Sequence, residues 1–438
     1  MILIKNGYLI NPKARTEGRR DILIANGRIV QIRTALTERY CEAYAADPSH
    51  HVADPALRVI DASHLIVAPG LVDTHSHFRD PGYPLKEDIV SGANSAMRGG
   101  YTTIIMMANT KPPIDNVDSL RDVLERGDQT PIHIYSAANA TIGMGGRELT
   151  DFHALKEAGA ACFTDDGKPI LDPVVFLAAL KAAKKERRPL SLHEENPAYI
   201  KQNGVNAGGY AARFLHLEGS SREAEISMVQ RDVDLAVKFM APLCIQHIST
   251  AEAVDIVRQG RKRNRKIHAE ATPHHFALTE EAVLRCGTMA KMNPPLRTEE
   301  DRLAIIDGLC DGTIDIIATD HAPHTAEEKA LPFAEAPSGI IGLETALSLG
   351  IRELVNKGYL SMTQLIECLS CNPAAYYCLP AGRVETGGPA DLVLFDEHEV
   401  WKVEPPFASR SSNTPFIGET MPGVVHYTIC GGKVVYEK

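Results

Sequence analysis

Residues 66–75 read IVAPGLVDTH, an apolar run that ends in polar side chains. Comparable β-rich runs recur up to about residue 325, and longer segments separate them. These segments are predicted to be amphipathic helices; in residues 221–240, apolar side chains recur at steps of three and four. Eight such runs alternating with helices favour an α/β fold, a parallel sheet closed into a TIM (β/α)8 barrel. The runs are IVAPGLVDTH, YTTIIMMAN, IHIYSAAN, ACFTDD, PLSLHEEN, LCIQHIS, KIHAEATPHH and TIDIIATDH.

Polar residues stand at the end of every one of these runs. In a closed barrel of parallel strands, the carboxyl ends of all strands meet at one face, and that face carries the active site. Polar residues that merely mark strand exits would explain one such ending, but not eight in succession. The residues concerned are His75, His77, Asn109, Asn139, Asp165, Asp166, His193, His247, His274, His275 and Asp320.

The two ends of the chain differ from the middle, because short apolar runs alternate there with tight-turn sequences. Asn26–Gly27 and Gly431–Gly432 are typical of β-hairpin turns, and Asn6–Gly7 is interpreted in the same way. The stretch from Glu38 to Pro55, rich in Ala, His and Asp, is expected to be a loop. We predict that both ends pack together as one small β-sandwich. The expected units are residues 1–66 and 384–438 for the sandwich and 67–383 for the barrel.

Composition narrows the possible functions. The chain has 438 residues with 44% hydrophobic side chains and a net charge of −10, without basic runs, which argues against nucleic-acid binding. No stretch approaches the roughly 18 apolar residues of a membrane span, and the opening MILIKNGYLI lacks the layout of a signal peptide. The nine scattered cysteines fit a reducing cytoplasm. Cys368 and Cys371 form a single C-x-x-C, which we interpret as incidental.

His75 and His77 suggest a metal site. Side chains two apart on a strand point the same way, so one metal can accept both imidazoles. A lone H-x-H is weak evidence, but His193, His247 and Asp320 end later strands of the same barrel. Nitrogen and oxygen donors converging on one face predict a zinc-type site.

Arg79 follows this pair and must serve another purpose. A guanidinium has no acceptor and stays protonated, so it cannot bind a metal, and it is repelled by one unless an anion lies between them. A substrate carboxylate is such an anion, and arginine binds it through a planar two-point fork. An ordinary ion pair with Asp80 is the alternative.

The motifs DTHSHFRDPG, MMANTKP, FTDDG, HEEN, QHIST, EATPHHF, MNPPLR and ATDHAPH, in this order, resemble the cyclic amidohydrolase superfamily, and within it the bacterial class I dihydroorotases. The resemblance covers nearly the whole chain. It implies two Zn²⁺ per chain, bridged by an aspartate and a hydroxide in place of the carboxylated lysine of most members. The alternation of side chains along a strand does not show whether Asp165 or Asp166 is the bridging residue, whereas the spacing to the next histidine in the family favours Asp166. The implied metal ligands are His75, His77, Asp166, His193, His247 and Asp320.

The same resemblance implies the substrate and the roles around it. The expected reaction is the reversible cyclisation of N-carbamoyl-L-aspartate to dihydroorotate in pyrimidine biosynthesis, through attack of the metal-bridged hydroxide on the ring amide. Asp320 is expected to act as general base and then acid; a helix N-cap is its alternative role. Lys168 is interpreted as a loop residue, and His274 and His275 as structural. The expected substrate contacts are His77, Arg79, Asn109, Asn293, His324 and the backbone of Ser338 and Gly339.

Two other functions remain open at this point. A hydantoinase, dihydropyrimidinase or allantoinase acts on a neutral ring, which gives Arg79 nothing to bind. The second is a catalytically silent barrel that assembles with aspartate transcarbamoylase; such a partner is expected to have lost ligands, and here all are present. A homodimer or a complex with that enzyme is also an open expectation for the active form.

Overall fold

The computed structural model describes all residues, 1–438, and contains the predicted barrel. Neighbouring strands are parallel throughout. β8 and β9 act as one barrel strand interrupted at Ala137, because β8 pairs with β7 and β9 pairs with β10. A parallel bridge between Ser76 and His321 joins the last strand to the first. The strands are β6 (Leu71–Ser76), β7 (Tyr101–Met106), β8 (His133–Ser136), β9 (Ala138–Asn139), β10 (Phe163–Thr164), β11 (Leu190–Leu192), β12 (Leu243–Ile245), β13 (Ile267–Ala271) and β14 (Ile316–Ile317).

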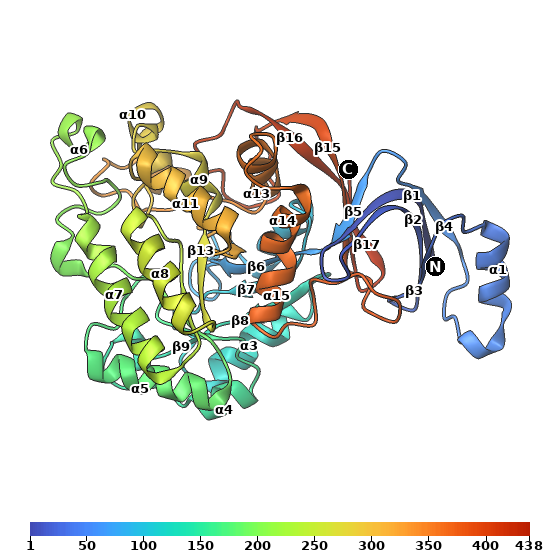
Figure 1. Cartoon of the computed structure of the whole chain (residues 1–438), viewed down its shortest axis with the longest axis horizontal. Helices are drawn as coiled ribbons and strands as arrows, with labels where there is room; N and C mark the ends of the chain where they lie inside the picture. Colours follow the sequence, from blue (N-terminus) through green and yellow to red (C-terminus); the bar gives the residue numbers. More distant parts are fainter.

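Helices surround the barrel, and a core cluster of 88 buried residues joins them to the strands (Figure 1). The helix predicted within residues 221–240 is α7 (Arg222–Phe239), which Ser221 caps by accepting a hydrogen bond from the amide of Glu223. The others are α2 (Ile89–Arg98), α3 (Val117–Gly127), α4 (Phe152–Glu157), α5 (Pro173–Glu186), α6 (Tyr210–Phe214), α8 (Ala251–Arg263), α9 (Pro273–Ala277), α10 (Ala282–Cys286), α11 (Glu299–Asp311), α12 (Ala326–Lys329), α13 (Ala346–Gly350), α14 (Met362–Ile366) and α15 (Asn372–Tyr376).

Both chain ends form the second unit, at one side of the barrel (Figure 1). Its strands hydrogen-bond in the order β17-β16-β15-β5-β1-β2-β3, and β4 pairs with β1. The sheet curls over its own core of 15 buried residues, and a bridge between Arg28 and Pro389 links its far edge to the chain entering β15. The strands are β1 (Ile2–Asn11), β2 (Thr16–Ala25), β3 (Arg28–Arg33), β4 (Arg58–Asp61), β5 (Ile66–Pro69), β15 (Leu392–Lys402), β16 (Thr420–Cys430) and β17 (Lys433–Glu437).

The run at residues 66–75 is two strands rather than one. β5 pairs with β1 and β15 in the terminal sheet, whereas β6 begins the barrel at Leu71. The chain passes between the two units at Gly70, where a Cβ would lie 2.2 Å from Oγ1 of Thr102. Only glycine fits so close an approach.

Two local predictions were wrong. The stretch from Glu38 to Pro55 is not a plain loop, because it contains α1 (Glu38–Ala46) and a 3-10 turn. Thr37 caps α1, and Cys41 is buried against the apolar side chains of β1 and β2. Asn6–Gly7 is a bulge inside β1, not a turn, because the register shifts between Ile4 and Gly7. The turns at Asn26–Gly27 and Gly431–Gly432 are confirmed as hairpin connections.

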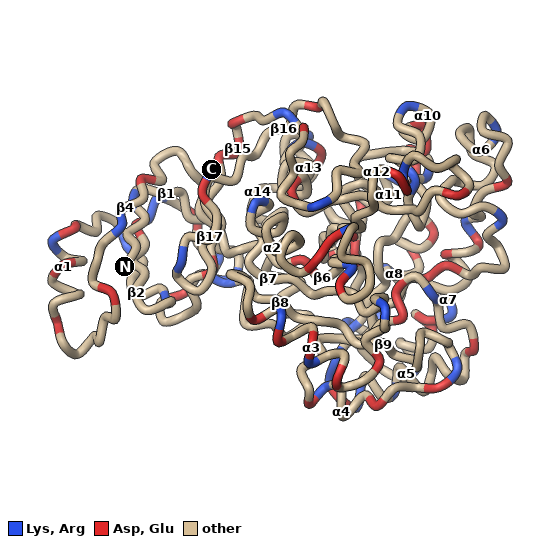
Figure 2. Tube along the Cα trace, turned by 180° about the vertical axis from the view of Figure 1, so that it is seen from behind, with Lys and Arg blue, Asp and Glu red and all other residues tan.

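Lysines and arginines are interspersed with acidic residues along the whole trace (Figure 2). No helix combines the length and the apolar character that crossing a bilayer requires.

Candidate active site

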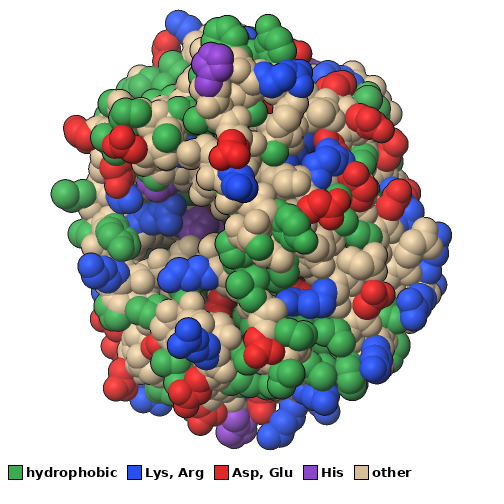
Figure 3. Space-filling view, turned by 90° about the vertical axis from the view of Figure 1, so that its left-hand side faces the viewer, with side chains coloured by type: hydrophobic (Ala, Val, Ile, Leu, Met, Phe, Trp, Pro, Cys, Tyr) green, Lys and Arg blue, Asp and Glu red, His purple; other side chains and the backbone are tan.

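Six of the predicted residues lie at the carboxyl ends of the barrel strands. His75 lies in β6 and His77 just after it; Asp166, His193, His247 and Asp320 each follow a strand. All six are buried. Viewed from the barrel end, the surface is hollowed, with histidine at the floor of the hollow and lysine or arginine beside it (Figure 3).

Asp166 lies at the centre of this group. Its carboxylate oxygens are 3.5 Å from Nε2 of both His75 and His77, and 3.8 Å from Nδ1 of His193 and from Nε2 of His247. Burial by itself would raise the pKa of Asp166, but His75 and the other imidazoles outweigh it and hold that pKa well below its usual range.

The neighbouring Asp165 points the other way, as expected for successive strand residues. It accepts hydrogen bonds from the backbone amides of Ala140 and Thr141, at 2.9 Å and 3.1 Å, and thereby ties two strand ends together. Lys168 is exposed and contacts none of the imidazoles. The structure therefore brings Asp166, and neither Asp165 nor Lys168, among the histidines.

Asp320 approaches the same group from β14. Its Oδ1 lies 3.0 Å from Nε2 of His77 and 3.6 Å from Nε2 of His75. Burial would raise the pKa of Asp320, but the imidazoles of His75 and His77 lower it overall. The next helix begins at Ala326 with Thr325 as its cap, so Asp320 caps no helix.

The imidazoles are oriented by acidic partners that the sequence pattern alone did not indicate. Glu270 of β13 lies 3.2 Å from Nδ1 of His75 and also accepts from Thr74, and Glu195 lies 3.0 Å from Nε2 of His193. Such contacts fix which ring nitrogen faces the site. The signal available in the sequence was an acidic residue inside an apolar strand, the glutamate of KIHAEATPHH.

The donor set suits a divalent metal. His75, His77 and Asp166 form one group of possible ligands, and Asp166, His193 and His247 form another. Asp166 belongs to both groups, so a single carboxylate can contact two ions. The buried Nε2 of His75 has no hydrogen-bond partner, which is costly for a polar atom unless a ligand satisfies it. Imidazole and carboxylate donors are those that zinc accepts.

Arg79 lies beside this group without a carboxylate partner. Its Nε is 3.4 Å from the carbonyl of Pro323 and its Nη2 is 3.5 Å from Nε2 of His324, both long contacts. The alternative prediction, an ion pair between Arg79 and Asp80, is wrong, because Asp80 pairs with Arg126 at 2.8 Å. Arg79 is thus a cation available to an incoming anion.

Two of the other predicted contacts are already engaged. Asn109 lies 3.0 Å from Nδ1 of His77 and donates to Asp166 at 3.1 Å, so it orients this imidazole and this carboxylate. Nε2 of His324 faces the carbonyl of Ser338 at 2.9 Å, and burial followed by Arg79 lowers the pKa of His324 to about 2. His324 is therefore neutral at pH 7.

The remaining predicted residues differ in whether their polar groups are already hydrogen-bonded within the protein. The amide of Gly339 donates to the carbonyl of Lys291 at 2.8 Å, so it is not free to bind a ring, and Ser338 donates its hydroxyl to Asn203. Asn293 keeps a buried, unpartnered Oδ1 and places its Nδ2 3.5 Å from Nε2 of His193. His275 bonds Thr272 and the carbonyl of Pro294, in keeping with a structural role.

The comparisons with known proteins agree with this chemistry. The model of the amidohydrolase family matches residues 66–435. Proteins named dihydroorotase are 51% identical in Clostridioides difficile and 48% identical in Clostridium acetobutylicum, each over 100% of both chains. One from Lactococcus lactis is 45% identical over 100% of this chain and 99% of its own.

Solved structures show the same fold. An L-hydantoinase (dihydropyrimidinase) from Arthrobacter aurescens superposes with a TM-score of 0.87 at 24% identity, over 100% of this chain and 96% of that one. A D-hydantoinase (dihydropyrimidinase) from Thermus sp. gives 0.83 at 22% identity, over 100% and 95%. The family model and the full-length relatives together settle the family: the chain belongs to the amidohydrolases and, among them, to the dihydroorotases.

Proposed function

We propose that this chain catalyses the reversible ring closure of N-carbamoyl-L-aspartate to dihydroorotate and water. The observation that carries the proposal is Arg79, a cation without a carboxylate partner next to a group of metal-type donors. Dihydroorotate carries one carboxylate on the ring carbon beside the reacting amide, so an anion and a scissile bond are presented together. The relatives named dihydroorotase support this choice of substrate.

Two Zn²⁺ ions fit the donors best, with His75, His77 and Asp320 on one side and His193 and His247 on the other. Asp166 would be the shared ligand, because its carboxylate lies 3.5 Å from Nε2 of His75 and 3.8 Å from Nε2 of His247. When bound, zinc supplies water that is activated for attack at neutral pH and neutralises charge that develops on the amide oxygen.

Asp320 is proposed to move the proton. Its carboxylate lies 3.0 Å from Nε2 of His77 and, as an ionised group with free lone pairs, can accept a proton from the attacking water. The protonated acid then delivers this proton to the ring nitrogen as the amide bond breaks. In ring closure the same steps run in reverse, and Asp320 takes the proton from the carbamoyl nitrogen.

Arg79 is proposed to hold the substrate carboxylate. A two-point contact fixes the plane of the carboxylate and hence the position of the neighbouring carbonyl. Asn293, in the loop before α11, supplies a free acceptor for a ring N–H. Asn109 acts indirectly, since it orients His77 and Asp166.

The rival reading is a hydrolase of neutral rings, the activity that the superposed hydantoinases carry in their names. Their identity of 24% or less supports the fold alone. The decisive experiment is steady-state turnover of dihydroorotate beside hydantoin, with metal content measured on the same preparation. Turnover of hydantoin without dihydroorotate would select the rival, and a metal-bound chain inactive on both would select the silent partner.

We also propose a cytoplasmic location, which the nine free cysteines favour. A homodimer or a complex with aspartate transcarbamoylase is the assembly to test. Light scattering of the chain alone and after mixing with the transcarbamoylase distinguishes the two.

A further inference from the structure

A second group of metal-type donors lies where the barrel meets the terminal sheet. His133 is the first residue of β8, Asp391 precedes β15, and Cys430 ends β16. Their donor atoms all lie within 4.8 Å of one another. Because β8 begins at His133 and the active site lies at the carboxyl ends of the strands, this group is at the opposite end of the barrel.

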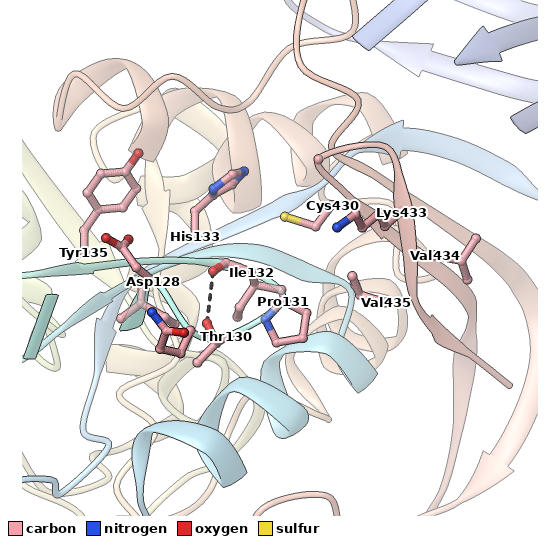
Figure 4. A pocket seen from close by; sticks show the side chains of 13 residues that line it. Asp128, Thr130, Pro131, Ile132, His133, Tyr135, Cys430, Lys433, Val434 and Val435 are labelled. Atoms are coloured by element: carbon pink, nitrogen blue, oxygen red, sulfur yellow. Dashed lines mark hydrogen bonds between the residues drawn. The ribbon is translucent and has the colours of Figure 1, made fainter. Parts of the chain in front are cut away.

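The carboxylate of Asp391 lies at the centre of this group. Its Oδ2 is 3.1 Å from Nε2 of His133, and its Oδ1 accepts the backbone amide of Gly431 at 2.7 Å. Figure 4 shows the imidazole of His133 and the sulfur of Cys430 turned toward each other. Contact between the three donors therefore needs side-chain adjustment and no rearrangement of the strands that carry them.

The group is open to solvent on one side. His133 and Cys430 line a cavity of about 750 Å³, whose wall also includes Tyr135 and Lys433 (Figure 4). The side chain of His133 is 44% exposed, whereas that of Asp391 is only 5% exposed. An ion can thus enter from the cavity, and water from the cavity can complete its coordination.

We propose that His133, Asp391 and Cys430 form a separate metal site, distinct from the catalytic group, for Zn²⁺ or a chemically similar divalent ion. Thiolate and imidazole donors select zinc, cobalt or cadmium over magnesium and calcium, which prefer oxygen. The thiol loses its proton on binding, since the thiolate is the ligand.

Such an ion would link the two units of the fold. The three donors come from three chain segments, one in the barrel and two in the terminal sheet. An ion that binds only the folded chain stabilises it in proportion to its binding free energy. The alternative is a plain ion pair between His133 and Asp391, with Cys430 as a packed thiol whose sulfur lies 3.7 Å from the carbonyl of Thr102.

Cobalt distinguishes these possibilities, because the catalytic group contains no cysteine. Titration with Co²⁺ of the full chain, its catalytic group first saturated with Zn²⁺, should give a near-ultraviolet thiolate-to-cobalt charge-transfer band that saturates at one equivalent per chain. Cys430→Ser should abolish this band. Cys378→Ser, which removes an exposed cysteine, should keep it. Absence of the band in the unmodified chain, or its persistence in Cys430→Ser, would overturn the proposal.

A second readout guards against a folding defect in Cys430→Ser. His133→Gln changes an accessible side chain, and it should weaken Co²⁺ binding at this site at least tenfold while circular dichroism stays unchanged. Asp166→Ala should keep the band, since it alters only the catalytic group. Zn²⁺ should raise the Tm of Asp166→Ala more than that of the double variant with His133→Gln, because both variants keep the same residual catalytic donors. Equal Tm shifts in both would refute the site, whatever the outcome for the proposed activity.

Discussion

Replacement of Arg79 by alanine tests the link between this guanidinium and an acidic substrate. The side chain makes only long contacts within the protein, 3.4 Å to Pro323 and 3.5 Å to His324, and it ligates nothing. Its loss should therefore leave the metal ligands in place. The substitution should therefore weaken substrate binding without affecting metal binding.

The size of the effect follows from the contact that is lost. A hydrogen bond to a charged group contributes about 1.5–3 kcal/mol, and an arginine fork makes two. Two such bonds contribute about 3–6 kcal/mol. Arg79 is only partly buried, so we take the lower part of this range, about 3–4 kcal/mol. Since each 1.4 kcal/mol is a factor of ten, kcat/KM for dihydroorotate should fall roughly 10²- to 10³-fold, mainly through KM.

The assay is steady-state turnover in both directions, with bound metal measured on the same samples. Arg126→Ala is the matched control, because it removes a nearby arginine whose partner is Asp80, and it should keep KM within about twofold. If Arg79→Ala loses metal, or if its KM is unchanged, the role assigned to Arg79 is wrong.

Three further predictions concern the proton, the metal and the pH. Asp320→Asn should lower kcat about 10²- to 10⁴-fold with metal retained, and a near-normal rate would place proton transfer elsewhere. Glu270→Gln weakens the contact that orients His75 and should lower metal affinity about 10- to 100-fold by competition with a chelator; unchanged affinity would leave Glu270 a packing residue. Burial, with a smaller effect of Lys291, lowers the pKa of Lys329 in the folded chain from 10.5 to about 7. Between these two pH values the lysine binds a proton in the unfolded chain but not in the folded chain. Stability should thus rise between pH 7 and pH 10, and Lys329→Met should flatten this slope in urea titrations whereas Lys168→Met should not.

The barrel was predictable because its signals repeat. Each strand is an apolar run that ends in polar residues, and closure of the ring brings those ends together whatever the details of the helices. His75, His193 and Asp320 meet for this reason, although more than a hundred residues separate each from the next. The choice between Asp165 and Asp166 could not be made from the strand pattern alone. Successive residues of a strand point to opposite faces, and the pattern does not show which of the two faces the histidines.

Other features could not be predicted because they depend on partners distant in sequence. α1 is built mostly from good helix formers, but a helix of nine residues is marginal by itself, and the burial of Cys41 against the terminal sheet stabilises it. Asn6–Gly7 has a turn-like sequence, yet the strand continues because β5 packs so close that a Cβ on Gly7 would lie 2.4 Å from Val67. The amide of Gly339 is committed to Lys291, which no local pattern indicates.

Backbone geometry at the strand ends ties the fold to the chemistry. Arg79, His247 and Asp320 have φ values of 58°, 31° and 47°, a region that costs a residue with a side chain about 1–3 kcal/mol. Glycine would relieve this strain at each position but would remove the cation, the imidazole or the carboxylate. The barrel tolerates the strain because neighbouring strands fix these turns; the amide of His77, for example, donates to the carbonyl of His321 at 2.8 Å. Left-handed residues just beyond the strand ends thus carry three different functional groups at the face where the imidazoles and carboxylates meet.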